Sequence, residues 1–322
     1  MLVPVLLFAL GLVLLIKGGD WFVDAATGIA HRFHIPELLI GATVVSIGTT
    51  LPEVMVSASS ALSGHGEIAY GNAIGSIICN TSLIAALTIA VRPPKVEGKS
   101  LTMPVLFFFG AAVVYTLVAV LLGEFTRWVG LALLAIFTAY MICNVLRVKR
   151  LPVDAAGADA AGQEKKSLLS EAIRLALGAA AIAWGADLLV DNGTLIAQRL
   201  GVPESVIALT FMALGTSLPE LVTAVTALVK GHGALSLGNI IGANLFNLVL
   251  VSGLSVVLAP FAVPASKTIA GMNASLVVDI PLMFFVMAFM TLPAIIRGKL
   301  QRWQGVTLLG VYAAYVGFQF FG

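Results

Sequence analysis

Charged residues are scarce in this sequence. Only 11% of its 322 residues are Asp, Glu, Lys or Arg, whereas about a quarter of the residues are charged in a typical soluble domain. Hydrophobic residues make up 59% of the chain, and the mean hydropathy is +1.04. A chain of this composition cannot cover itself with a polar surface, which excludes a water-soluble globular protein. The sequence therefore predicts an integral, multi-pass membrane protein.

Cysteine and basic clusters are also scarce. The two cysteines, Cys79 and Cys143, lie in separate apolar runs, so we expect small buried thiols rather than a disulfide. The net charge is only +2, and no basic stripe with interleaved aromatic residues is present, which excludes nucleic acid as a partner. The first apolar run lacks a basic region and a cleavage site, so we expect a retained helix rather than a signal peptide. Neither a cofactor nor an obligatory protein partner is expected.

Long apolar runs are abundant, and a helix that crosses about 30 Å of hydrocarbon needs roughly 20 residues. Ten such runs can be drawn, which predicts an all-α membrane protein with ten transmembrane helices. Their expected ranges are 2–30, 36–62, 68–91, 101–122, 128–147, 168–198, 203–229, 235–260, 275–296 and 303–321.

The chain contains an internal duplication. Aligning residues 18–80 with residues 185–247 at a constant offset of 167 makes 25 of 63 positions identical without a gap. Each copy holds five expected spans, an odd number, so the second copy must enter the membrane from the opposite face. The sequence thus predicts two inverted five-helix repeats, at 1–150 and 167–322, joined by a polar linker at 151–166.

Basic residues are distributed unequally between the two sets of loops. Thirteen Lys and Arg residues fall on the face that holds the linker, and three fall on the other, namely Arg127, Arg199 and Lys267. By the positive-inside rule the first face is cytoplasmic, which places both termini outside. We expect the protein in a bacterial or archaeal inner or plasma membrane.

Each repeat carries one glutamate inside an apolar run, at the end of the same motif: GTTLPE at 48–53 and GTSLPE at 215–220. An ionisable residue in hydrocarbon is costly enough to indicate function. Pro52 and Pro219 each remove a backbone hydrogen bond to the residue four positions earlier. We therefore expect both helices to break at the proline, and broken helices supply cation ligands in transporters.

Further oxygen-bearing side chains recur at helical spacing. Thr49 and Glu53 are four residues apart, as are Thr216 and Glu220, so each pair shares a helix face. In the next span Asn72, Ser76 and Asn80 form one stripe, about 12 Å long at 1.5 Å per residue. Asn72 and Asn80 are two turns apart and cannot both contact one ion. We interpret Ser76 and Asn80 as ligands, and Asn72 with its counterpart Asn239 as supporting residues.

These candidate ligands are all oxygens, without the His and Cys convergence that favours zinc or copper. Flexible mixed oxygens and two carboxylates suit Ca²⁺ and Na⁺ better than Mg²⁺, which demands octahedral geometry. The alternative for each glutamate is a satisfied polar group that joins helices. For Asn80 and Asn247 the alternative is interhelical hydrogen bonding.

Two other sets of matched polar residues have mainly structural interpretations. Asp20, Asp24, Asp187 and Asp191 lie near an interface, as entrance charges or, as we favour, helix-end partners of Lys17, Arg32 and Arg199. His65 and His232 occupy matched GHG turns. We interpret both as turn residues, with a proton sensor or surface metal ligand as the alternative.

GTTLPE with GNAIGSIICN, and GTSLPE with GNIIGANLFN, resemble the alpha repeats of the Na⁺/Ca²⁺ exchanger family, prokaryotic type, within the cation/Ca²⁺ exchanger superfamily. The resemblance implies ten helices, both termini outside and an alternating-access antiporter with a central cation cluster. It places the ion-binding positions of the first repeat at Ser46, Thr49, Thr50, Glu53, Ser76 and Asn80. In the second repeat they fall at Ala213, Thr216, Ser217, Glu220, Ala243 and Asn247.

The chain departs from some relatives at two of these positions. Ala243 replaces a serine, which removes a hydroxyl from one sodium position, and Asn247 replaces an aspartate, which resembles the K⁺-independent members. Together these features predict a secondary antiporter that exchanges Na⁺ for Ca²⁺. The alternative is a Ca²⁺/H⁺ antiporter that uses the same glutamates. An intramembrane hydrolase would need paired Asp residues at mid-span, and a channel would need weak sequential sites, so neither is favoured.

Overall fold

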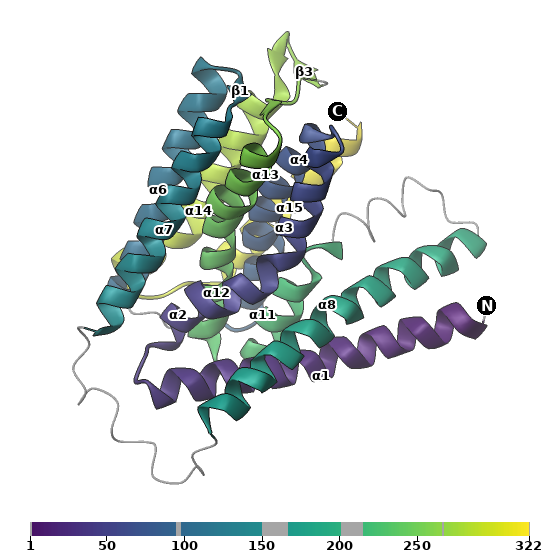
Figure 1. The fold of residues 1–322 in the computed structure, drawn as a ribbon, viewed down its shortest axis with the longest axis vertical. Helices are drawn as coiled ribbons and strands as arrows, with labels where there is room; N and C mark the ends of the chain where they lie inside the picture. The colour runs from purple at the N-terminus through teal and green to yellow at the C-terminus, as the bar shows by residue number, and fades with distance from the viewer. Residues whose placement is uncertain (1, 95–97, 150–166, 201–214, 266, 322) are drawn as a thin grey trace.

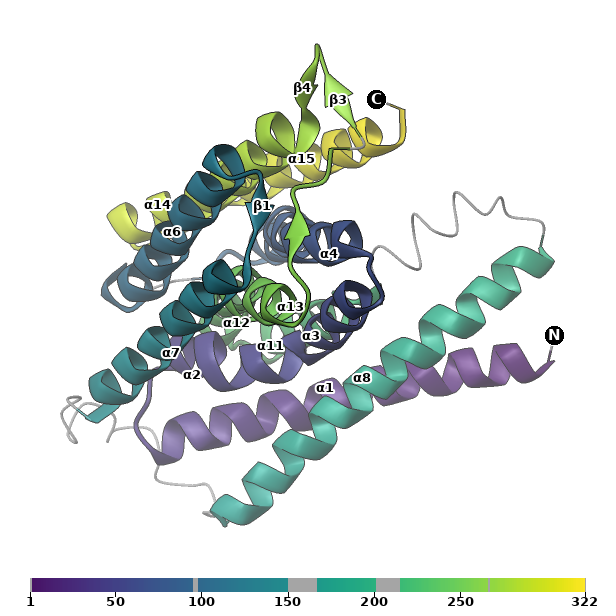
Figure 2. The same cartoon turned by 45° about the horizontal axis from the view of Figure 1, so that its top comes forward.

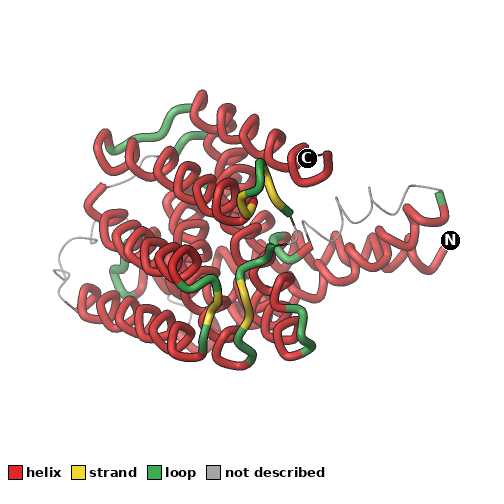
Figure 3. Tube along the Cα trace, turned by 90° about the horizontal axis from the view of Figure 1, so that it is seen from above, coloured by secondary structure: helices red, strands yellow, loops and turns green. Residues whose placement is uncertain are grey.

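The computed structural model describes residues 2–94, 98–149, 167–200, 215–265 and 267–321. The expected linker at 151–166 and part of the expected span at 203–229 lie outside the described residues. Helices dominate the described residues, and the short strands lie only in loops (Figure 3).

The first half of the chain forms five spans. The first is α1 (Leu2–Arg32), the fourth is α6 (Gly98–Leu121) and the fifth is α7 (Arg127–Lys149), and the second and third each consist of several segments. The second span consists of α2 (Glu37–Ile40), the π-helical turn η1 (Gly41–Val45) and α3 (Ser46–Leu62). The third consists of α4 (Gly66–Cys79), η2 (Asn80–Ala85) and α5 (Ala86–Val91).

The second half begins with α8 (Leu168–Arg199) and α11 (Leu218–Lys230), which are followed by a span made of three segments. It ends with the π-helical turn η6 (Ser275–Asp279), α14 (Ile280–Arg297) and α15 (Arg302–Phe321). The three segments are α12 (Gly233–Phe246), η5 (Asn247–Val251) and α13 (Ser252–Leu258). Two antiparallel strand pairs join loops: β1 (Glu124–Phe125) with β2 (Phe261–Ala262), and β3 (Thr268–Ile269) with β4 (Met272–Asn273).

Eight helices of the described part are long and apolar enough to cross a membrane. Large apolar side chains lie exposed on their outer surfaces, such as Leu106, Ile142 and Phe285, as lipid-facing residues do. The eight correspond to eight of the ten expected spans: the first six, the span at 235–260 and the span at 275–296. The expected span at 303–321 corresponds to α15, and α11 supplies the described part of the one at 203–229.

The α12–η5–α13 span is the most deeply buried of the eight. Its apolar residues, including Ile240, Leu245 and Phe246, belong to the main hydrophobic cluster, together with residues of α4, α6 and α14. Phe246 also makes edge-on contacts with the rings of Phe137 and Tyr140 on α7. This span therefore forms the centre around which the other helices pack.

Two helices, α1 and α8, cross the outside of this bundle side by side (Figures 1 and 2). Glycines allow their backbones to approach closely. A Cβ atom on Gly11 would lie 2.8 Å from the Gly185 carbonyl oxygen, and one on Gly18 would lie 3.0 Å from the Gly178 carbonyl oxygen. Any side chain at these positions would push the helices apart, so α1 and α8 form a tightly packed pair.

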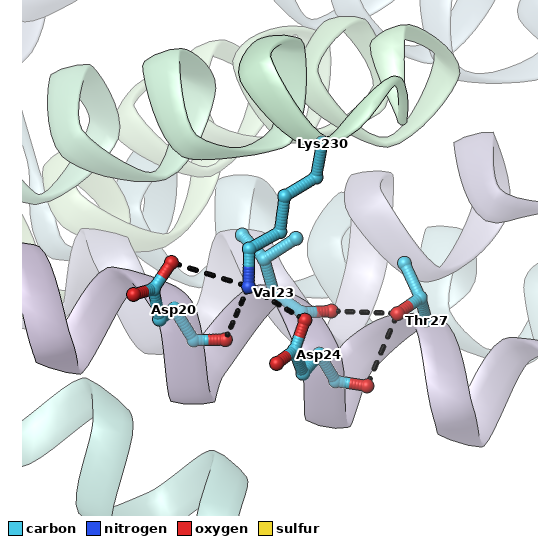
Figure 4. A network of polar contacts seen from close by, with 5 residues as sticks. All are labelled: Asp20, Val23, Asp24, Thr27 and Lys230. Atoms are coloured by element: carbon cyan, nitrogen blue, oxygen red, sulfur yellow. Dashed lines mark hydrogen bonds and ion pairs between the residues drawn. The ribbon is translucent and has the colours of Figure 1, made fainter.

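The acidic residues of α1 have a different partner from the basic residues that we expected. The Lys230 ammonium at the end of α11 lies 2.7 Å from Asp24 Oδ1 and 3.2 Å from Asp20 Oδ1 (Figure 4). The pairing thus joins two helices about two hundred residues apart in the sequence, which local spacing cannot reveal.

Candidate functional site

The two motif glutamates are brought together in the interior. Glu53 lies on α3 and Glu220 in the first turn of α11, and both side chains are fully buried. The two helices contact each other, so both carboxylates lie in the same part of the interior. Each repeat thus places one buried carboxylate in the protein interior.

The helix break predicted in the second repeat is confirmed. Thr216 and Ser217 form a turn, α11 begins at Leu218, and Pro219 stands in its first turn, where its missing N–H costs no helical bond. Glu220 therefore sits at a helix N-terminus, whose partial positive charge favours a carboxylate.

The break predicted at Pro52 is wrong. The α3 helix runs without interruption from Ser46 to Leu62 with Pro52 inside it. The irregular backbone lies earlier, in the π-helical turn at Gly41–Val45. A single proline removes only one helical hydrogen bond, and α3 packs against α4, α12 and α13. The Gly48 carbonyl, four residues before Pro52, still lacks the bond that a non-proline residue would give it.

Two π-helical turns begin at Asn80, which we interpreted as a ligand, and at Asn247, which the resemblance to the exchanger family assigns to the site. The η2 turn begins at Asn80 and the η5 turn begins at Asn247, at the same place in each repeat. Turns of this kind interrupt regular helical bonding and often occur at functional sites. Both asparagines are fully buried, and none of their side-chain N and O atoms has a hydrogen-bond partner among the described residues.

The other asparagine pair connects the repeats. Thr49 Oγ1 donates to Asn239 Oδ1 at 3.2 Å, and in mirrored fashion Thr216 Oγ1 donates to Asn72 Oδ1 at 3.4 Å. Asn72 also donates to Ser57 Oγ at 2.8 Å and to the Glu53 carbonyl oxygen at 3.3 Å. Supporting residues are expected to make bonds of this kind, because they hold the threonines and the glutamate helix in place.

Most of the remaining candidate ligands are also buried or half-buried. Ser46, Thr49, Thr50, Ser76 and Ser217 are buried, and Thr216 is half-buried. Ser46 Oγ donates to the Gly41 carbonyl oxygen at 2.7 Å and approaches the Asn239 carbonyl oxygen at 2.9 Å, so its hydroxyl is committed to the backbone. Its own carbonyl remains the group that could face an ion. Ala243 is buried without a polar side chain, and Ala213 lies outside the described residues.

Buried polar atoms of several candidate ligands, and of Thr223, lack hydrogen-bond partners among the described residues. They comprise both carboxylate oxygens of Glu53 and of Glu220, the amides of Asn80 and Asn247, and the hydroxyls of Thr50, Ser217 and Thr223. Each unsatisfied buried group costs about 1–3 kcal/mol. Among the described residues these atoms are therefore not engaged in interhelical hydrogen bonds. Two carboxylates together with several neutral oxygens form a donor set that fits a hard cation.

Thr223 was missed by the sequence reasoning. It is fully buried, and its hydroxyl is one of the unpartnered atoms. It follows Glu220 by three residues and so shares a helix face with it, a signal that was available. Because the matched position in the first repeat is Val56, a search restricted to identities between the repeats passes over it.

A charged cluster outside the carboxylate site joins the turn before α12 to the start of α2. His232 Nδ1 lies 2.8 Å from Glu37 Oε1, and His31 Nε2 lies 3.7 Å from the same oxygen. The hydrogen bond to Glu37 raises the pKa of His232 above its ordinary value of 6.5. His232 is thus more than a turn residue, since it links the two repeats.

This link predicts a pH-dependent contribution to stability. A raised pKa means that folding favours the protonated imidazole, so the stabilisation is full below pH 6.5 and is lost as the pH rises through the raised value. The pair is partly exposed, so the effect should be about 0.5 kcal/mol. Thermal unfolding followed across pH 5.5 to about 8.5 should show this loss in the parent protein and not in His232→Gln. His31→Gln, which removes a longer contact, should retain it, and identical pH profiles for the parent and His232→Gln would contradict the assignment.

A multi-pass helical membrane protein with a buried cluster of carboxylate, amide and hydroxyl groups has the architecture of a membrane transporter. The chain belongs to the sodium/calcium exchanger protein family, whose family model matches residues 3–146 and 170–321. It is accordingly an exchanger of this family and not an enzyme.

Individual relatives cover most of the chain. The sodium/calcium exchanger MaX1 of Methanosarcina acetivorans is 31% identical over 97% of this chain and 97% of its own length. The inner membrane protein YrbG of Escherichia coli is 36% identical over 81% of each chain. Among solved structures, the sodium-calcium exchanger NCX_Mj soaked with Na⁺ and Sr²⁺ superposes with a TM-score of 0.80, at 30% identity over 98% of both chains.

Proposed function

We propose that this protein is a secondary antiporter that exchanges Na⁺ for Ca²⁺ by alternating access, with Glu53 and Glu220 shared by the two cations. The observation that carries the proposal is the set of buried, unpartnered oxygens at the candidate positions of both repeats, which includes both carboxylates. Cation exchange is also what the names of MaX1 and NCX_Mj state for those relatives.

The ligand set that we propose joins the two repeats. In the first repeat it comprises Ser46 through its carbonyl and the side chains of Thr49, Thr50, Glu53, Ser76 and Asn80. In the second it comprises Ala213 through its carbonyl and the side chains of Thr216, Ser217, Glu220 and Asn247. The position of Thr223 beside Glu220 adds it to this set.

The charge of the site explains why transport should be an exchange. Two carboxylates balance one Ca²⁺ or two Na⁺, so the two ions compete for the same charges. Without a cation, two carboxylates would stand unpaired in a medium of low dielectric constant. The unloaded carrier should therefore cross between its two states reluctantly, which makes exchange obligatory.

Protons are the alternative counter-ion, because the same carboxylates could release Ca²⁺ on protonation. The two couplings separate in vesicles that contain the purified protein. Uptake of radiolabelled Ca²⁺ at equal pH on both sides should rise when Na⁺ is loaded inside, and a pH gradient without Na⁺ should leave it near background. Uptake that follows the pH gradient and ignores Na⁺ would favour the Ca²⁺/H⁺ antiporter.

We further propose that both termini lie outside and that the linker at 151–166 lies in the cytoplasm, on the basis of the thirteen-to-three distribution of basic residues. In a Cys143→Ser background, which removes the exposed native thiol, a cysteine in the linker should be shielded from an impermeant thiol reagent added to intact cells. A cysteine added after Gly322 should be labelled. The reverse pattern would overturn this orientation.

A further inference from the structure

Lys230 fixes α1 to the bundle at one end of the molecule. Its ammonium lies 2.7 Å from Asp24 Oδ1, 3.2 Å from Asp20 Oδ1 and 3.3 Å from the Asp20 carbonyl oxygen. In Figure 4 the lysine descends from its helix to the surface of α1, where the two aspartates stand one turn apart and flank its ammonium. Three oxygens of one helix thus hold a single cation of another.

The same contact is closely packed beneath the ion pairs. A Cβ atom on Gly19 would lie 2.8 Å from Thr226 Oγ1 and 2.8 Å from Val222 Cγ1, both on α11. The α1 helix therefore sits directly on α11, with Lys230 across the contact. Because α1 is also packed tightly on α8 through glycines, this contact ties the α1–α8 pair to the rest of the protein.

The duplication supplies the acidic residues twice but the lysine only once. At the offset of 167, Asp20 and Asp24 correspond to Asp187 and Asp191, whereas Lys230 corresponds to Ser63. Asp187 and Asp191 have no ion pair within 4.0 Å among the described residues. In the part of the chain that the structure describes, the ionic contact made by Lys230 thus has no counterpart in the other repeat.

Inverted repeats allow a carrier to adopt two states in which the repeats exchange their arrangements. On that basis, and resting on the transport function proposed above, we infer that Lys230 with Asp20 and Asp24 forms a one-sided latch that favours the described state over its inverted counterpart. The counterpart would break the Lys230 contacts and place Asp187 and Asp191 near Ser63, where no cation replaces them. Lys230 thereby biases the side of the membrane from which the carrier binds ions. By the loop charges, the latched end is cytoplasmic.

The inference can be tested by measuring the distance between α1 and the bundle. Spin labels at the exposed positions Val13 on α1 and Leu131 on α7, in a Cys79→Ala/Cys143→Ala background, report the two states as separate distances. Partly exposed ion pairs shift an equilibrium only modestly, so Lys230→Ser should raise the ratio of the second state to the first by about fivefold. Lys230→Arg keeps the charge and should leave the ratio unchanged.

A gain of function provides the stricter test. Ser63→Lys creates the missing cation opposite Asp187 and Asp191 and should also shift the ratio toward the second state, and Lys230→Ser/Ser63→Lys should shift it furthest. The shifts of Ser63→Lys and of Lys230→Ser/Ser63→Lys should both become smaller at high ionic strength, because salt screens partly exposed ion pairs. A distance distribution that is the same in Lys230→Ser, Ser63→Lys and the parent protein would overturn the latch. Because these distances are measured without transport, they remain informative if Na⁺-driven Ca²⁺ flux is absent, and normal flux with unchanged distances would refute the latch alone.

Discussion

Glu53→Gln and Glu220→Gln should each abolish Ca²⁺ exchange. The charge of the site is the reason: with one carboxylate neutralised, a divalent ion in a buried site keeps half of its compensating charge. Removing one partner of a buried charge pair costs about 3–5 kcal/mol, which corresponds to a loss of Ca²⁺ affinity of roughly 100- to 4,000-fold. Uptake of radiolabelled Ca²⁺ into Na⁺-loaded vesicles should fall to background for both variants.

Thermal unfolding separates this loss from misfolding. Glutamine has nearly the volume of glutamate, and neither carboxylate has a hydrogen-bond partner among the described residues. The variants should therefore be at least as stable as the parent protein without Ca²⁺, but should lose the stabilisation that added Ca²⁺ provides. Glu124→Gln, which alters an exposed carboxylate of β1, should exchange normally. Normal Ca²⁺ flux in either site variant would remove the central claim.

Asn247→Asp should give the exchanger a dependence on pH or K⁺ that the parent protein lacks. Asn247 is fully buried, begins the η5 turn and has no side-chain hydrogen-bond partner among the described residues. A third carboxylate there must be protonated or paired with an extra monovalent cation, because an isolated buried charge is unfavourable by several kcal/mol. Na⁺-driven Ca²⁺ uptake should then vary with pH or K⁺.

Two other asparagines serve as controls for this variant. Asn80→Asp changes the matched position of the first repeat and should act in the same way. Asn144→Asp changes a buried amide of α7, where Nδ2 donates to the Tyr140 carbonyl oxygen at 2.9 Å, and should reduce stability without adding an ion dependence. If the parent protein requires K⁺, or if Asn247→Asp alters neither dependence, position 247 does not line the cation site.

Much of the architecture follows from patterns that the sequence displays directly. The apolar runs predicted the membrane-spanning helices, because hydrocarbon leaves a backbone few alternatives to a helix. The duplication predicts that Glu53 and Glu220 belong to one site, and the structure buries both side chains on α3 and α11, two helices that contact each other. The residues near them were recognised mainly because they recur in both repeats at helical spacing.

The backbone irregularities could not be predicted in the same way. Proline at position 52 suggested a break, but α3 passes through it and the π-helical turn lies at Gly41–Val45. Whether a helix breaks depends on the packing of neighbouring helices, and no single residue of the motif reports this packing. The π-helical turns at Asn80 and Asn247 have no local signature either, although the two sites match.

The pairing of charges between distant helices could not be predicted from the sequence either. Local spacing suggested Lys17, Arg32 and Arg199 as partners for the aspartates, whereas Lys230 holds Asp20 and Asp24 across a gap of about two hundred residues. Similarly, the turn residue His232 meets Glu37 on another element. Both contacts depend on how the two repeats are set against each other, and that arrangement appears only in three dimensions.

Obligatory exchange at a shared glutamate pair is tested most directly by following both ions in the same vesicles. Vesicles containing the protein are loaded with radiolabelled Na⁺, and uptake of radiolabelled Ca²⁺ is recorded together with Na⁺ efflux at equal pH on both sides. The account predicts that Ca²⁺ entry and Na⁺ exit rise together and that Ca²⁺ uptake without internal Na⁺ or Ca²⁺ stays at background. Both fluxes should vanish in Glu53→Gln and Glu220→Gln. Sustained Ca²⁺ uptake into vesicles that hold neither ion, or Ca²⁺ entry without accompanying Na⁺ exit, would contradict it.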